Sequence, residues 1–115
     1  MTDPEPMFAL TPAMLHILLV LVDDEKHGYA IMQAVMTLTD GQMRLAPGTL
    51  YRSIKKMLDA GLIVETDERP DPALDDERRR YYRITEIGER VVTTEIRRLA
   101  HLVDAQPARR LLGKV

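Results

Sequence analysis

The residues best suited to a defined chemistry lie in a short predicted helix within residues 45–63. At about 100° per residue, its apolar residues share one face and its basic and hydroxyl residues share the other, with Tyr51 and Ser53 on the flanks. Arginine can bind guanine through two hydrogen bonds, threonine and serine can bind either base, and lysine can neutralise a phosphate. The pattern predicts entry into a DNA major groove, and a solvated surface helix is the alternative. The candidate DNA-contacting residues of this helix are Thr49, Tyr51, Arg52, Ser53, Lys55 and Lys56.

A second basic block follows this helix in the chain and consists of Arg78, Arg79 and Arg80. Its side chains are suited to contacts with the phosphate backbone. The alternative is that they pair with the neighbouring acids of residues 75–77. Tyr51 also has two interpretations, since its hydroxyl could reach a phosphate or its ring could pack against the segment that carries the arginines.

The charge is concentrated in blocks. The chain has 115 residues and a net charge of −2, which by itself does not favour binding to a polyanion. Residues 42–63 nevertheless carry a net +3 and residues 78–83 a net +4, while acids predominate in residues 1–41 and 65–77. Because one basic face is enough to bind DNA, the distribution is compatible with such binding.

Three further helices and two strands are predicted to position these side chains. Hydrophobic periodicity predicts helices over about residues 11–22, 27–39 and 85–105, and β-branched residues predict strands over 62–66 and 80–84. The two strands would form a hairpin, or wing. The expected fold class is mainly α with a small β-hairpin, a winged helix-turn-helix followed by a C-terminal dimerisation helix.

Several helix ends are marked by residues with specific backbone roles. Thr11 and Thr85 are suited to capping the first turn of a helix, and Pro12 and Pro47 are suited to a first helical position. Gly61 is suited to the left-handed residue that follows a helix C-terminus. These signals fix the basic helix between Pro47 and Gly61.

The apolar surfaces of the first and last predicted helices indicate a homodimer. The first helix has almost no polar face, and the last has an apolar stripe that no later segment could cover. A second copy of the chain could cover both. The residues expected at the dimer interface are Leu15, Leu18, Leu19, Val22, Val92, Ile96, Leu99 and Val103.

The expected organisation has four parts. Residues 1–9 form a flexible arm, residues 10–84 form the winged helix-turn-helix domain, residues 85–105 form the dimerisation helix, and residues 106–115 form a flexible basic tail.

The composition argues against several other functions. The chain has no cysteine, hence no disulfide, thiolate metal site or cysteine nucleophile, and this fits a reducing cytoplasm. Its three histidines lie far apart, so neither a metal site nor a cofactor is expected. No catalytic motif is present, so an enzyme is not expected. The apolar run at residues 13–22 is too short to cross a membrane, and the acidic, proline-rich residues before it are not expected to act as a signal peptide.

Four motifs, in order and with the right gaps, resemble the PadR family of bacterial transcriptional regulators. They lie at residues 27–29, 47–51, 61–63 and 80–88, and the resemblance covers about residues 10–104. The chain length resembles the short subfamily with a single C-terminal helix. The resemblance implies a homodimeric repressor on a roughly palindromic double-stranded DNA operator. It also implies that the third helix enters the major groove, that the wing approaches the flanking backbone or the minor groove, and that the first and last helices dimerise.

The resemblance leaves some points open. Some family members release DNA when a small phenolic or hydrophobic effector binds, and release by such a ligand stays open here. Ala46 stands where the family usually has serine, which removes an N-cap hydroxyl at a cost of about 1 kcal/mol. The wing loop is long and acidic, so phosphate would repel residues 75–77. A MarR-type regulator and a winged-helix protein-interaction module without DNA binding are the alternatives.

Overall fold

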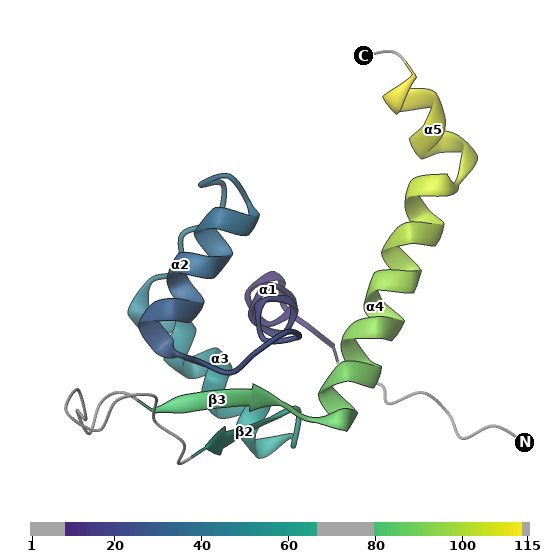
Figure 1. Ribbon diagram of the computed structural model, residues 1–115. Helices are drawn as coiled ribbons and strands as arrows, with labels where there is room; N and C mark the ends of the chain where they lie inside the picture. Colours follow the sequence, from purple (N-terminus) through teal and green to yellow (C-terminus); the bar gives the residue numbers. More distant parts are fainter. Residues whose placement is uncertain (1–8, 67–79, 114–115) are drawn as a thin grey trace, which may run out of the picture.

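The computed structural model describes residues 9–66 and 80–113. Its elements, in chain order, are α1 (Pro12–Val20), β1 (Lys26–His27), α2 (Gly28–Leu38), α3 (Pro47–Asp59), β2 (Ile63–Thr66), β3 (Tyr81–Ile84), α4 (Glu86–Asp104) and α5 (Gln106–Leu112). Figure 1 shows α1, α2 and α3 gathered against the small sheet, with α4 leaving the sheet as a long projecting helix. The predicted fold class, mainly α with a winged helix-turn-helix and a long C-terminal helix, is confirmed.

Three helices begin at a side chain that satisfies a free backbone N–H group of the first turn. Thr11 Oγ1, His27 Nδ1 and Thr85 Oγ1 each accept a hydrogen bond from the amide three residues later, at 3.1, 3.2 and 3.0 Å. Such caps stabilise a helix by about 1 kcal/mol. Helix α3 instead follows Ala46, which makes no side-chain cap hydrogen bond. The caps predicted at Thr11 and Thr85, and the missing cap at Ala46, are therefore confirmed.

The end of α3 has the geometry that the sequence predicts. Gly61 has a φ of +75°, in the left-handed region that glycine adopts without strain. Its amide donates to the Leu58 carbonyl at 3.1 Å, and the Leu62 amide donates to the Met57 carbonyl at 2.9 Å. These two bonds satisfy the last carbonyls of the helix and turn the chain directly into β2.

The sheet has three antiparallel strands in the order β1-β3-β2. Tyr82 in the central strand β3 pairs with Lys26 of β1 on one side and with Glu65 of β2 on the other. The predicted hairpin of β2 and β3 is confirmed, and β1 is an additional strand that was not predicted. A strand of two residues has no alternating pattern to detect, and its pairing depends on β3, which lies far away in the chain.

Helix α1 is the centre of the core, and it contacts α2, α3 and α4. Figure 1 views α1 nearly end-on, between α2 and α4. Ile17 and Leu18 are fully buried. The remaining buried hydrophobic side chains come from the surrounding helices and strands and from the ends of α1, and they are Met14, Leu21, Ile31, Val35, Leu50, Ile54, Met57, Leu62, Ile63, Tyr82, Ile84, Val91 and Val92.

Four sequence predictions need correction. The first helix ends at Val20, two residues early, and Val22 lies in the following loop. Leu18 and Val92, expected at the dimer interface, are 0% and 4% exposed because they face the core of their own subunit. Residues 106–112 form α5 instead of a frayed tail, so the last helix is not single. Proline is tolerated in the first turn of a helix, and the arginine and leucine that follow favour helix.

Candidate nucleic-acid interface

Helix α3 has a buried apolar face and, on its opposite side, an exposed basic face. Leu50, Ile54 and Met57 are buried, and they pack the helix against α1, α2 and β2. Arg52, Lys55 and Lys56 are exposed, whereas Thr49 is partly buried. The buried apolar face fixes the helix, so the basic side chains project from a rigid support. This arrangement suits a helix that enters a DNA groove.

The exposed face begins at the N-terminal turn of α3. Nη2 of Arg52 lies 3.4 Å from Oγ1 of Thr49, and Nη1 lies 3.5 Å from the position of a Cβ built on Gly48. The guanidinium group therefore lies back over the first turn of the helix, beside a residue with no side chain. Lys55 pairs with Asp59 across one turn, at 3.6 Å, and both side chains are exposed. An exposed pair of this kind constrains the lysine only weakly.

Ser53 does not lie where the sequence analysis placed it. Its residue is 6% exposed, so it belongs to the buried side of α3 and not to the flank that faces outward. It follows Leu50 by three residues and precedes Met57 by four, which places it in the same buried arc of the helix. A short side chain at this position allows neighbouring elements to cover it. Ser53 therefore has no access to the bases of a bound duplex.

Tyr51 packs against the beginning of α2. A Cβ built on Gly28 would lie 2.6 Å from the Tyr51 hydroxyl oxygen and 3.2 Å from the adjoining ring carbon. Glycine at residue 28 lets the ring lie in this place, and any larger residue would displace it, which gives the His-Gly-Tyr motif at residues 27–29 a physical reason. Tyr51 is still 47% exposed, so its outer edge stays accessible beside the basic face. The sequence suggested a phosphate or the wing as the neighbour of Tyr51, and the observed neighbour is α2.

The two adjacent tyrosines of β3 have different environments, as the alternation of a strand requires. Tyr82 is buried, whereas Tyr81 is only partly buried. Burial raises the pKa of Tyr82 above its ordinary value of 10.0, the carboxylate of Glu65 and the phenol of Tyr51 raise it further, and Arg80 opposes them. Tyr81 meets the ring of His27 edge-on, with centroids 5.3 Å apart.

Of the second basic block, Arg78 to Arg80, the structure describes only Arg80. Arg80 is exposed, and its Nη1 lies 3.6 Å from Oε2 of Glu65 on the neighbouring strand. The pair joins the end of β2 to the start of β3. Arg78 and Arg79, together with the acids of residues 75–77, lie outside the described residues, so the expectations for them stay predictions.

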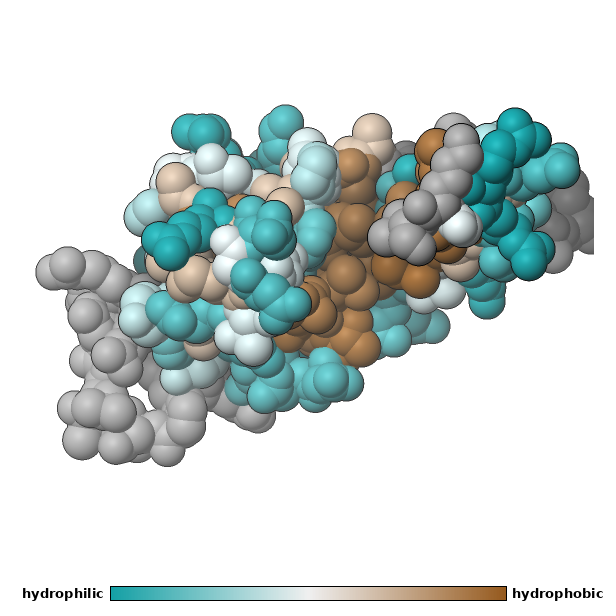
Figure 2. Space-filling view, turned by 90° about the horizontal axis from the view of Figure 1, so that it is seen from above, coloured by the Kyte–Doolittle hydropathy of each residue, from teal (hydrophilic) through white to brown (hydrophobic). Residues whose placement is uncertain are grey.

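An apolar surface lies away from this basic face. Figure 2 shows a hydrophobic area between α2 and the C-terminal helices, where Figure 1 places α1. On α1, Leu15 and Leu19 are partly buried, and Val22 just beyond it is exposed. On α4, Ile96 and Val103 are exposed and Leu99 is partly buried. These six residues remain candidates for a dimer interface after Leu18 and Val92 are removed.

Residues 9–66 and 80–113 contain neither a metal-binding cluster nor a membrane-spanning helix. No group of three or more histidine, acidic or cysteine side chains in that part of the chain could hold a metal ion. None of its helices is long and apolar enough to cross a membrane.

The fold and the basic helix together define a winged helix-turn-helix protein. Residues 17–94 match the transcriptional regulator PadR-like family, and the chain belongs to that family. Its members regulate transcription and are not enzymes, and the recognition of the family from the four motifs is confirmed. A comparison with curated proteins finds no match.

Solved structures share the fold at low sequence identity. A transcriptional regulator from Clostridium thermocellum, Cth-833, has a TM-score of 0.67 and 22% identity, and the match covers 89% of this chain and 87% of that one. RosR from H. salinarum has a TM-score of 0.65 and 22% identity, with 91% and 88% covered. PadR from Bacillus subtilis, solved in complex with operator DNA, has a TM-score of 0.62 and 20% identity, with 74% and 46% covered.

Proposed function

We propose that this regulator acts as a homodimer that binds an operator in double-stranded DNA, with one α3 helix in the major groove of each half-site. The observation that carries the proposal is the exposed basic face of α3, where Arg52, Lys55 and Lys56 project from a helix whose opposite side is locked into the core. The fold shared with Bacillus subtilis PadR, which was crystallised on operator DNA, supports it.

The proposed contacts follow from the position of each side chain. Arg52 and Thr49 lie at the N-terminal part of α3, where a recognition helix meets base edges, so they are assigned to base reading. Lys55, Lys56 and the exposed edge of Tyr51 are assigned to phosphates. Ser53 is left out because it is buried.

The wing supplies further phosphate contacts in this proposal. Arg80 is exposed at the base of the wing, and its pairing with Glu65 is loose enough to be exchanged for a phosphate. Arg78 and Arg79 extend the same basic block in the sequence. These contacts would anchor the flanks of each half-site without reading its sequence.

The dimer interface is proposed to lie on the apolar surface of α1 and α4. Leu15, Leu19, Val22, Ile96, Leu99 and Val103 are the residues assigned to it. A contiguous apolar surface of this kind is a common feature of subunit interfaces.

In the proposed dimer, residues 10–84 act as the DNA-binding domain and residues 85–105 as the dimerisation helix. Two-fold symmetry in the protein would match a roughly palindromic operator, at which the regulator acts as a repressor. Release by a small hydrophobic or phenolic ligand is part of the same proposal.

The first experiment identifies the operator and tests the role of α3. Purified protein selects DNA from a random pool, and affinities for the selected duplex and a scrambled duplex are measured at one salt concentration. Arg52→Ala should lose about 1–3 kcal/mol per half-site on the selected duplex and relax the preference at one symmetric position. Arg98→Ala is the matched control, because it removes the same charge from α4, where Arg98 is paired with Glu95.

Salt dependence distinguishes the proposal from its alternative. The slope of log affinity against log salt should be about −0.9 for each phosphate neutralised. A protein that selects no sequence and shows no salt-dependent DNA binding would be a winged-helix protein-interaction module. Light scattering tests the assembly separately, with an expected mass of twice 13.1 kDa.

A further inference from the structure

Helix α5 presents an apolar face that the described part of its own subunit does not cover. None of its residues is buried, and Leu111 and Leu112 are 66% and 60% exposed. Among the described elements, α4 is its main neighbour. At about 100° per residue, Ala108, Leu111 and Leu112 share one face, Arg109 borders it, and Arg110 points away from it. The apolar face of α5 therefore suits an apolar surface, and Arg109 at its border suits an acidic side chain next to that surface.

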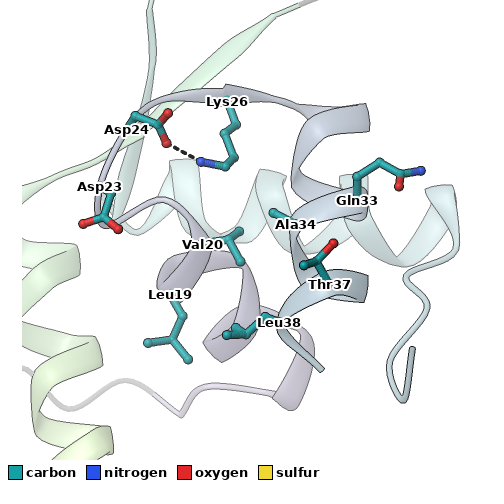
Figure 3. A pocket seen from close by; sticks show the side chains of 9 residues that line it. All are labelled: Leu19, Val20, Asp23, Asp24, Lys26, Gln33, Ala34, Thr37 and Leu38. Atoms are coloured by element: carbon teal, nitrogen blue, oxygen red, sulfur yellow. Dashed lines mark hydrogen bonds and ion pairs between the residues drawn. The ribbon is translucent and has the colours of Figure 1, made fainter. Parts of the chain in front are cut away.

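A groove between α1 and α2 offers a surface of that kind. It has a volume of about 870 Å³. Figure 3 shows Val20 of α1 facing Ala34 of α2, with Leu19 and Leu38 towards one end. Acidic side chains of the loop after α1 lie at the other end, where Asp24 pairs with Lys26 and Asp23 lies beside them.

The groove and α5 have opposite charges. Residues 23–26 carry three acids and one base, whereas residues 106–115 carry three bases and no acid. Figure 1 shows α5 at the far end of α4, across α1 from α2, so the rigid helix α4 holds it away from the groove of its own subunit. The α5 helix of a second subunit has no such restriction, because its α4 is not part of the subunit that forms the groove.

We propose that α5 of each subunit docks in the α1–α2 groove of its partner, with Leu111 and Leu112 on the apolar floor and Arg109 against Asp23. This inference rests on the homodimer of the proposed function and adds a second, reciprocal contact to it. The partner is a second copy of this chain, and the contact occurs twice in each dimer. The C-terminal helix then acts as a clasp between the subunits.

Cross-linking between different chains tests the clasp. The chain has no cysteine, so each single variant carries one thiol. A tagged Leu38→Cys protein is mixed with untagged Leu112→Cys protein, subunits exchange, and mild oxidation follows. A disulfide needs Cα atoms within roughly 7 Å, so a mixed covalent species forms only where α5 of one chain lies in the groove of the other. Arg110→Cys, on the opposite side of α5, is the matched control and should cross-link at least about tenfold more slowly.

The outcomes separate this inference from the proposed function. If light scattering shows a dimer and operator binding is intact, but Leu112→Cys cross-links no faster than Arg110→Cys, the clasp is wrong and the proposed function stands. A chain that remains a monomer overturns both the clasp and the proposed dimer. A groove occupied by a small ligand or by another protein would also give no mixed cross-link, and that result overturns the clasp.

A charge exchange supplies a second, independent measurement. Arg109→Glu replaces an attraction to Asp23 by a repulsion, which weakens a surface pair by about two- to fivefold. Because the pair occurs twice, the dimer dissociation constant should rise roughly four- to twenty-five-fold, and Asp23→Arg in the same chain should restore it. Arg110→Glu should leave the constant nearly unchanged. Equal effects of Arg109→Glu and Arg110→Glu, or no rescue by Asp23→Arg, would contradict the contact.

Discussion

Replacing Thr85 tests whether its side chain joins the start of α4 to the end of α3. Its Oγ1 accepts from the Gly88 amide at 3.0 Å and donates to the Gly61 carbonyl at 2.6 Å. Its own amide donates to the Leu62 carbonyl at 3.0 Å. One side chain thus caps α4 and ties it to the end of α3, so Thr85→Ala removes two hydrogen bonds at once.

The size of the loss follows from these two bonds. Removing a threonine N-cap costs about 1 kcal/mol. The bond to Gly61 contributes about 0.5–1.5 kcal/mol, and water can replace part of it because Gly61 is only partly buried. Thr85→Ala should therefore lower the free energy of unfolding by about 1.5–2.5 kcal/mol. For a chain of this length that corresponds to a decrease of roughly 6–10 °C in the thermal midpoint.

Urea denaturation at one fixed protein concentration measures this loss, because the apparent stability of a dimer depends on concentration. Thr85→Ser is the matched control, since it keeps the hydroxyl and loses only a methyl group, and it should stay within about 1 kcal/mol of the original chain. If Thr85→Ala and Thr85→Ser unfold at the same urea concentration, the hydroxyl does not join α3 to α4 and the reasoning is wrong.

Three further predictions concern single positions. Ala46→Ser should supply the missing cap of α3 and raise the free energy of unfolding by about 1 kcal/mol in urea denaturation, and no gain would contradict the cap geometry. Gly88→Ala would place a Cβ 2.1 Å from the Leu62 carbonyl oxygen, so it should destabilise the fold by about 1–3 kcal/mol or more. Gly48→Ala meets only ordinary contacts and is its stability control. Because the pKa of Tyr82 is raised when folded, the unfolded chain ionises first and stability falls as pH rises above 10.0. Tyr82→Phe should lack that part of the alkaline loss when urea midpoints at about pH 8 and pH 11 are compared, and an identical loss would refute the assignment.

Local signals in the sequence were enough for much of the fold. The caps at Thr11 and Thr85, the proline at Pro47 and the left-handed Gly61 each depend on a few neighbouring residues, and the structure has each of them in its expected place. The division of α3 into a buried and a basic side was also predictable, because helical periodicity sorts residues over a single element.

The errors at Ser53, Leu18, Val92 and Tyr51 share a physical cause, since each depends on what packs against an element from elsewhere in the chain. Ser53 is small and polar, and nothing local indicates that other elements cover it. Leu18 and Val92 are apolar on helices with more than one apolar side, and periodicity cannot assign each side to the core or to a partner. Tyr51 on α3 lies against Gly28 on α2, so this approach joins two helices. The only sign of it in the sequence was the glycine itself at residue 28.

The junction at Thr85 has a consequence for regulation in the proposed dimer. Hydrogen bonds from Thr85 fix the start of α4 to Gly61 and Leu62 at the end of α3, and Gly88 approaches Leu62 too closely for any larger residue. The angle between α4 and the recognition helix is therefore nearly rigid within each subunit. Two recognition helices must lie about 34–36 Å apart to enter successive major grooves. Since each α3 is carried by its own α4, a change in how the two subunits pack would alter this spacing without any change at the DNA-contacting face.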